Sequence, residues 1–118
     1  MPQKSIQIKR IYEEYSDADG YRILVDRLWP RGISKANAKI DLWSKDVAPS
    51  NDLRKWYSHN LKKAKQFEAK YIKELEGNLE ALNNFKENIV DRKTITLLYA
   101  SKDANPIHAM VLKQFLTK

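Results

Sequence analysis

Three short runs of apolar and β-branched residues, far apart in the chain, most constrain how this sequence can fold. They lie at residues 6–11, 21–26 and 94–100. The first run nearly alternates with polar residues, which predicts a strand with one solvated face. The second contains Ile23, Leu24 and Val25 in succession, which is typical of a strand buried on both faces. Helical patterns fill most of the chain between the second and third runs. We therefore predict an α/β fold with a small, mostly parallel sheet of three or four strands and packed helices.

Apolar residues at spacings of three and four predict the helices. Ser50 has the side chain of a helix N-cap, and the helix that follows is expected to end near Ser58. Further helices are predicted over residues 61–75 and 79–89, and a last one after Asn105 and Pro106. Residues 27–50 are predicted to be irregular apart from a short helical turn at residues 36–39. A loop this long in a small domain is typical of a functional segment, and Trp29 and Trp43 can anchor it to the core.

Length and composition exclude several classes of protein. The 118 residues fit one domain spanning positions 1–118. The chain has no cysteine, which excludes disulfides, zinc–thiolate sites and thiol nucleophiles. The first residues lead into no apolar signal segment, and the apolar runs are far too short to cross a membrane. We expect a soluble cytoplasmic protein without membrane contact, whose oligomeric state the sequence leaves open.

Basic residues are concentrated in one part of the chain. The net charge is +7, and residues 54–73 contain seven lysines and arginines against only Glu68. Acidic side chains predominate in residues 74–91. A basic surface attracts phosphates, so these helices are one candidate for binding nucleic acid. A solvated helix face that aids solubility is the simpler interpretation.

Two segments are expected beyond the carboxyl ends of the strands, where ligands bind in parallel sheets. The first is residues 26–32, in which Arg27 and Arg31 flank a Trp-Pro pair. Two guanidinium groups facing one cleft can bind a phosphate or carboxylate, and Trp29 offers a flat stacking surface. The structural alternative is that Arg27 pairs with Asp26 or a helix C-terminus and that Trp29 fills the core.

The second segment runs from Tyr99 to His108 and leads into the last helix. The N–H groups at a helix start favour an anion, with Asn105 as the predicted N-cap. His108, in the first turn, can contact the same anion or transfer a proton, and Asp103 can orient it. Tyr99 adds a second stacking wall. The structural alternative is a histidine bonded to a backbone carbonyl.

The sequence gives no support for a metal or a cofactor. The two histidines, His59 and His108, belong to no close metal-ligand motif. The three glycines form no phosphate-binding loop, so P-loop and dinucleotide-binding folds are not expected. Ser101 lacks the flanking glycines of a nucleophile elbow.

Several blocks of the sequence, in order, resemble the YeaO-like family of uncharacterised proteins (domain of unknown function 488). The blocks are Asp26-Arg27-Leu28-Trp29-Pro30-Arg31-Gly32, Trp43 with Ala48-Pro49-Ser50, Leu53-Arg54-Lys55-Trp56, residues 67–71 with Glu74-Leu75, and Thr96-Leu97-Leu98-Tyr99-Ala100 with His108-Ala109. The resemblance implies a small bacterial-type α/β domain and no particular activity. More distant members of the wider family place a cysteine just before the histidine and an arginine just after it. This chain has Ile107 and Ala109 at those positions. Thiol-dependent chemistry that analogy with those members would suggest is therefore excluded.

These observations predict a module that binds an anionic small molecule or a phosphate-bearing partner at the carboxyl edge of its sheet. The predicted ligand-binding residues are Asp26, Arg27, Trp29, Arg31, Tyr99 and Asn105. One alternative is a hydrolase- or transferase-like enzyme acting on a phosphate ester, with His108 as the acid or base and Asp103 as its partner. The other is a nucleic-acid-binding module that uses the basic helices of residues 54–73.

Overall fold

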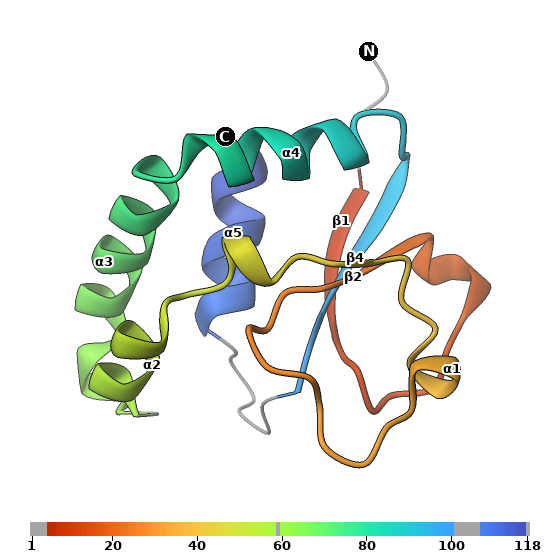
Figure 1. The fold of residues 1–118 in the computed structure, drawn as a ribbon, viewed down its shortest axis with the longest axis horizontal. Helices are drawn as coiled ribbons and strands as arrows, with labels where there is room; N and C mark the ends of the chain where they lie inside the picture. Colours follow the sequence, from red (N-terminus) through yellow and green to blue (C-terminus); the bar gives the residue numbers. More distant parts are fainter. Residues whose placement is uncertain (1–4, 59, 101–106, 118) are drawn as a thin grey trace.

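Four parallel strands form one sheet in the order β1-β4-β2-β3 (Figure 1). The computed structural model describes residues 5–58, 60–100 and 107–117. The strands are β1 (Ser5–Arg10), β2 (Tyr21–Leu24), β3 (Leu42–Trp43) and β4 (Thr94–Tyr99). The predicted α/β class with a small parallel sheet is therefore confirmed. Strand β4, the last in sequence, lies between β1 and β2, so the carboxyl ends of these three strands meet at one edge.

Four of the helices cover one face of this sheet, and their apolar sides form the main core (Figure 1). The helices are α2 (Asn51–Tyr57), α3 (Ala64–Glu76), α4 (Leu79–Ile89) and α5 (Ile107–Thr117). Alternate strand residues such as Ile23, Ile95 and Leu97 point into this core and are fully buried. The Ser50 Oγ accepts a hydrogen bond from the Leu53 N–H at 3.1 Å, as expected of an N-cap.

The other face of the sheet is covered by the segment that joins β2 to β3 and by the short helix α1 (Lys35–Ala38). Leu24 and Leu98, neighbours across β2 and β4, are fully buried on this side. Burial of Ile23 and Leu24 on opposite faces confirms that β2 is covered on both sides. Trp29 and Trp43 pack edge to face, with ring centroids 5.4 Å apart, and anchor this segment to the sheet.

Towards the amino ends of the strands, the same face carries a buried ionic network. The Arg22 guanidinium forms an ion pair with Asp19 and also donates to the backbone carbonyls of Ala38 and Lys39. Lys9 binds the same Asp19 carboxylate at 3.1 Å. Burial by itself raises the pKa of Asp19, but the hydrogen bonds from Lys9, the Ser16 N–H and Arg22 outweigh it and leave the pKa below its ordinary value.

Gly20 joins this network to strand β2 through a backbone conformation that requires glycine. It follows the 3₁₀ helix η1 (Asp17–Asp19) and has φ of +66°. A Cβ atom at this position would lie 2.4 Å from the Thr94 carbonyl oxygen. Any side chain would therefore push η1 away from β4.

The remaining differences from the sequence prediction concern short elements. Residues 27–50 are not wholly irregular, because β3 and the 3₁₀ helix η2 (Lys45–Val47) lie within them. The predicted helix over residues 61–75 begins as a separate 3₁₀ turn, η3 (Leu61–Lys63), before α3. The predicted turn at residues 36–39 is α1, shifted by one residue. The predicted cap of the last helix, at Asn105 and Pro106, lies outside the described residues.

Candidate functional site

Asp26 and His108 form a hydrogen-bonded pair beyond the carboxyl ends of β2 and β4. Asp26 follows β2 by two residues, and His108 lies in the first turn of α5. The Asp26 Oδ1 is 2.7 Å from the His108 Nε2, and Oδ2 accepts the Ala100 N–H at 2.8 Å. Both side chains are 18% exposed. The pair therefore joins β2 to α5 and fixes the imidazole at a solvent-accessible edge.

The hydrogen bond to Asp26 also determines which imidazole nitrogen is left for a ligand. A carboxylate only accepts hydrogen bonds, so Nε2 carries the proton that is shared with Asp26. Nδ1 of His108 has no hydrogen-bond partner among the described residues. It accepts a hydrogen bond when the ring is neutral and donates one when the ring is protonated.

Tyr99 ends strand β4 and forms a buried wall beside this imidazole. Its ring is 8% exposed and stands edge-on to His108, with ring centroids 6.3 Å apart. Burial raises the pKa of Tyr99, and the nearby Glu13 carboxylate raises it further, while Arg10 acts in the opposite direction. Tyr99 therefore lies at the predicted edge, in a position to order the imidazole.

Arg10, the last residue of β1, adds a cation to this edge that the sequence analysis did not single out. It pairs with Tyr99 in the sheet register, and its guanidinium donates to the Ala100 carbonyl at 3.2 Å. The guanidinium also lies 5.1 Å from the centre of the Tyr12 ring, whose hydroxyl donates to the Arg31 carbonyl at 2.8 Å. Arg31, with an exposed side chain, is thus tied to the edge through Tyr12. The signal that could have found Arg10 is its place at the end of a strand parallel to β4.

Arg27 binds backbone carbonyls with part of its guanidinium. Its Nε donates to the Pro49 carbonyl at 3.0 Å and one terminal nitrogen to the Ala48 carbonyl at 3.1 Å. The second terminal nitrogen has no hydrogen-bond partner among the described residues. Among the described residues Arg27 makes no hydrogen bond or ion pair with Asp26. Ala48 is the C-cap of η2, so the contact with its carbonyl matches the other structural pairing considered for Arg27, with a helix C-terminus. One face of the guanidinium is structural, and one nitrogen is left for a ligand.

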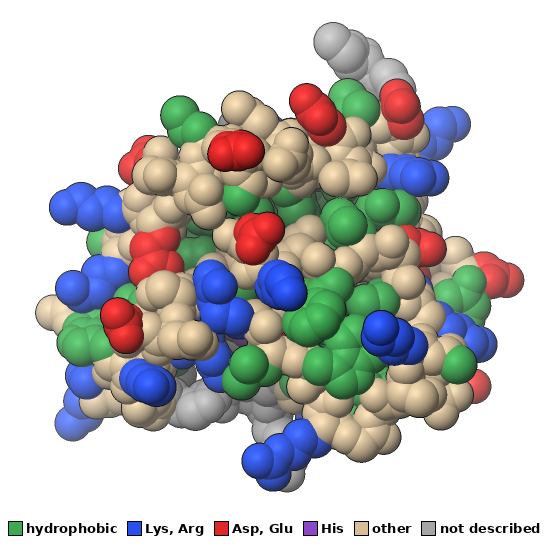
Figure 2. Space-filling view, in the orientation of Figure 1, with side chains coloured by type: hydrophobic (Ala, Val, Ile, Leu, Met, Phe, Trp, Pro, Cys, Tyr) green, Lys and Arg blue, Asp and Glu red, His purple; other side chains and the backbone are tan. Residues whose placement is uncertain are grey.

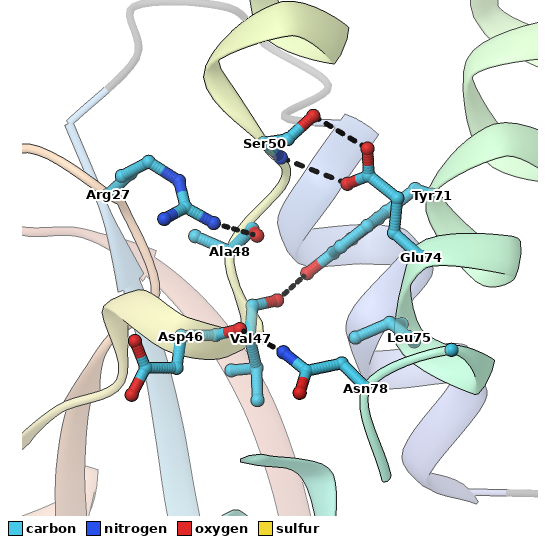
Figure 3. A pocket seen from close by; sticks show the side chains of 10 residues that line it. Arg27, Asp46, Val47, Ala48, Ser50, Tyr71, Glu74, Leu75 and Asn78 are labelled. Carbon is cyan, nitrogen blue, oxygen red and sulfur yellow. Dashed lines mark hydrogen bonds between the residues drawn. The ribbon is translucent and has the colours of Figure 1, made fainter. Parts of the chain in front are cut away.

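Three side chains from α3 and the turn after it bind the same segment, residues 46–50, from the other side (Figure 3). Together with Arg27 they engage four successive carbonyls and the N–H that follows. The contacts join Asn78 to the Asp46 carbonyl at 3.3 Å, the Tyr71 hydroxyl to the Val47 carbonyl at 2.5 Å, and the Glu74 carboxylate to the N–H and hydroxyl of Ser50 at 2.9 and 2.6 Å. The segment is therefore held through its main chain.

A cavity of about 380 Å³ lies between residues 46–50, Arg27 and the end of α3 (Figure 3). Tyr71 forms part of its wall. Burial raises the pKa of Tyr71, and the nearby Glu74 carboxylate raises it further. The Arg27 guanidinium lowers this pKa, whereas the Asp26 carboxylate raises it. Arg27, which lines this cavity, directly follows Asp26 in the chain, so the cavity lies near the Asp26–His108 pair. The Glu74 carboxylate accepts hydrogen bonds from the N–H and the hydroxyl of Ser50. The other charged side chains that line the cavity are Arg27 and the exposed Asp46.

Trp29 lies apart from these groups, on the face of the sheet that α1 covers. Its indole N–H donates to the Ile33 carbonyl at 2.8 Å, and its ring packs on Trp43. Trp43 in turn donates to the Asp26 carbonyl at 2.8 Å. This arrangement positions Asp26; the stacking role of Trp29 stays a prediction.

Two predicted site residues, Asp103 and Asn105, lie outside the described residues. Over the described ranges, no three His, Asp or Glu side chains gather as a metal site, and no helix has the length and apolar character needed to cross a membrane. What the structure does bring together at the carboxyl edge is an imidazole, a carboxylate and the guanidinium groups of Arg10 and Arg27, while Arg31 is connected to the edge through its backbone carbonyl. Such groups can bind an anion, and the carboxylate–imidazole pair can also transfer a proton.

Fold and site together define a small, cysteine-free, parallel α/β domain with a polar site at its carboxyl edge. The chain belongs to the family described as the inactive DUF488-N3 subclade, whose model matches residues 5–118. It is 40% identical to the uncharacterized protein YeaO of Escherichia coli over 112 residues, covering 95% of this chain and 96% of that protein. It is also 38% identical to the uncharacterized protein Rv3073c of Mycobacterium tuberculosis over 111 residues, covering 94% and 92%. The resemblance to the YeaO-like family is therefore confirmed. No solved structure gives a significant match.

Proposed function

We propose that this protein binds a small anionic ligand, bearing a phosphate or a carboxylate, at the carboxyl edge of its sheet. The observation that carries the proposal is the Asp26–His108 pair, which fixes an imidazole beside Arg27, the residue that follows Asp26. We expect the exposed Arg31 side chain to add positive charge there. The ligand charge is expected to lie between the His108 Nδ1 and the free terminal nitrogen of Arg27. The rest of the ligand would occupy the nearby cavity of about 380 Å³.

Binding without turnover accounts for these groups better than catalysis does. Each oxygen of the Asp26 carboxylate already accepts one hydrogen bond, from His108 or from the Ala100 N–H, so its described role is to position the imidazole and the chain after β4. Arg27 is partly immobilised by residues 48 and 49, which lowers the entropy lost when it binds a ligand. The family is described as an inactive subclade, in agreement with a binding role.

The test is a titration of the isotope-labelled protein with sodium phosphate at constant ionic strength, followed by NMR. Saturable shifts are expected at the Ala100 amide and at the His108 ring nitrogens. His108→Gln keeps a polar side chain but removes a charge-assisted hydrogen bond worth about 1.5–3 kcal/mol, so affinity should fall roughly tenfold or more. Lys35→Gln, an exposed change on α1, is the control and should bind as the parent does.

Equal phosphate affinity of the parent and the His108→Gln protein would overturn the proposal. So would shifts that sodium chloride reproduces at the same ionic strength, because these would show only general screening.

A second candidate function is an acid–base enzyme acting on a phosphate ester, favoured by the same 2.7 Å contact. In that case Asp26, rather than the sequence-predicted Asp103, is the described carboxylate that orients His108, and Nδ1 is the nitrogen that transfers the proton. A positioned acid or base contributes roughly 10²–10⁴-fold in rate, so His108→Ala should lose that much phosphatase activity on p-nitrophenyl phosphate. Absence of turnover by the parent, or full turnover by the variant, would exclude this function.

A further inference from the structure

The outer surface of α2, η3 and α3 carries an excess of positive charge away from the site described above. Its basic members are Arg54, Lys55, Lys62, Lys63, Lys65, Lys70 and Lys73, here called the basic helix surface. All are exposed except Lys63, which is partly exposed. Figure 2 shows Lys and Arg side chains along the rim that α2 and α3 form, with a few Asp and Glu side chains among them, and several Asp and Glu side chains along the edge that α4 forms. Residues 51–76 contain these seven lysines and arginines against Asp52, Glu68, Glu74 and Glu76, so the surface has an excess of positive charge.

Among the described residues, none of these cations lies within ion-pair distance of a carboxylate. The one acidic residue between positions 54 and 73 is Glu68. Because unpaired charges of one sign repel one another, their concentration here favours a partner of opposite charge.

Trp56 fixes two of these lysines in place. The Lys63 and Lys70 ammonium groups lie 4.8 and 5.0 Å from the centre of the indole ring. Lys63 also donates to the Trp56 carbonyl at 2.9 Å. Two ammonium groups positioned on one ring form a pre-organised pair, which loses less side-chain entropy on binding than free lysines do.

The helical geometry extends this pair into a row. Phe67, Tyr71 and Leu75 bury one side of α3, and Lys70 and Lys73 lie on the side away from them. Ten residues separate Lys63 from Lys73, which is roughly 15 Å along a helix at 1.5 Å per residue. Phosphates on one strand of duplex DNA follow one another every ~3.4 Å along the axis, so such a row faces several of them.

We propose that the basic helix surface binds the phosphate backbone of double-stranded nucleic acid without reading its sequence. Single strands are bound largely by stacking of bases on aromatic rings, but lysines already cover the Trp56 ring. Anionic membranes are bound by surfaces that also insert apolar side chains. In the described part of the chain, the exposed large apolar residues are Tyr12, Tyr15, Leu28, Leu79 and Val90, all outside residues 51–76.

The experiment measures fluorescence anisotropy of two duplex DNAs of unrelated sequence, over a series of salt concentrations. Both should bind with equal affinity, and the logarithm of the binding constant should fall with the logarithm of salt with a slope of about −3 to −5, for three to five phosphates. A quadruple variant, Lys62→Gln, Lys65→Gln, Lys70→Gln and Lys73→Gln, should lower affinity at low salt at least ~10-fold and flatten the slope by about 2–4.

The matched control changes four lysines elsewhere and alters net charge equally: Lys35→Gln, Lys86→Gln, Lys93→Gln and Lys113→Gln. It should retain affinity within about twofold and keep the slope, because those lysines lie outside the surface. Circular dichroism should show both variants folded, since neither removes a hydrogen bond that the structure contains. Equal losses in the two variants would show that only net charge matters and would overturn the proposal.

Two other results would overturn it in favour of a different partner. Binding to vesicles of phosphatidylglycerol without binding to duplex DNA would indicate a membrane. Salt-sensitive self-association in analytical ultracentrifugation, without DNA binding, would indicate that the surface meets the acidic α4 of a second copy. No residue of the basic helix surface belongs to the carboxyl-edge site, so any of these results leaves the phosphate titration of His108 unaffected.

Discussion

Replacement of Arg27 by Ala is expected to destabilise the protein by about 1.5–3 kcal/mol, because two hydrogen bonds of its guanidinium are lost. The change removes two charge-assisted hydrogen bonds, to the Ala48 and Pro49 carbonyls at 3.1 and 3.0 Å. Hydrogen bonds to charged groups contribute about 1.5–3 kcal/mol each, or roughly 3–6 kcal/mol for two. The expected loss is about half of this, because Arg27 is partly exposed and water can reach part of the vacated site.

Urea denaturation measures this loss. With a slope of roughly 1–3 kcal/mol per molar urea, the unfolding midpoint should fall by about 0.5–3 M. Arg27→Lys keeps the charge but not the planar fork, so it should recover less than half of the loss. Arg31→Ala is the control, since the described contact of Arg31 uses its carbonyl and not its side chain, and it should change stability by less than about 0.5 kcal/mol.

Equal stability of the Arg27→Ala and Arg31→Ala proteins would refute this reasoning. It would mean that residues 48 and 49 are held without the guanidinium and that Arg27 belongs wholly to the ligand site. A loss of stability in the Arg27→Ala protein, by contrast, would make Arg27→Lys the better variant for ligand titrations.

Three further changes test other parts of the fold. The lowered pKa of Asp19 means that its stabilising contribution is complete above its unfolded pKa of about 4 and is lost as pH falls through the folded value. Asp19→Asn leaves Arg22 buried without its counter-charge, so urea denaturation at neutral pH should show a loss of about 3–5 kcal/mol in the free energy of unfolding. The difference from the parent should shrink below about pH 4, and a difference independent of pH would contradict this. Tyr71→Phe strands the buried Val47 carbonyl and should cost about 1–3 kcal/mol by the same assay, whereas an unchanged midpoint would show that the carbonyl finds another donor. Gly20→Ala should cost about 1–3 kcal/mol in thermal denaturation, because its φ is positive and a Cβ would meet the backbone of β4; an unaffected melting temperature would disprove the constraint.

Elements with a local signal could be predicted from the sequence. The consecutive apolar residues of β2 required burial on both faces, and Ser50 had both the side chain and the position of an N-cap. Strand β3 could not be predicted in the same way, since Leu42 and Trp43 are too few to show a period. They form a strand because β2 offers free backbone groups beside them, which is a tertiary effect.

The sequence predicted which side chains lie at the carboxyl edge, but it did not predict the pairing of Asp26 with His108; that this edge binds a ligand stays a prediction. Parallel strands place Asp26, Arg27, Tyr99 and His108 at one edge whatever the details of packing. The described carboxylate partner of His108, however, is Asp26, which lies 82 residues earlier in the chain. The sequence prediction had instead chosen Asp103 because it is close to His108 in the chain. Which residues meet across that separation depends on the register of β2 with β4, and sequence spacing carries no information about register.

Residues 46–50 are held through their peptide groups, so a side chain such as that of Asp46 can change without altering the shape of the cavity. Asn78 holds Asp46 by the carbonyl and makes no demand on the carboxylate, which is exposed and lines the cavity. Exchanging this carboxylate for an amide would remove the local negative charge, and exchanging it for an amine would reverse it, while the contacts that hold residues 46–50 would stay. Under the proposed binding role, a single substitution at position 46 would therefore change which ligand charge the cavity prefers.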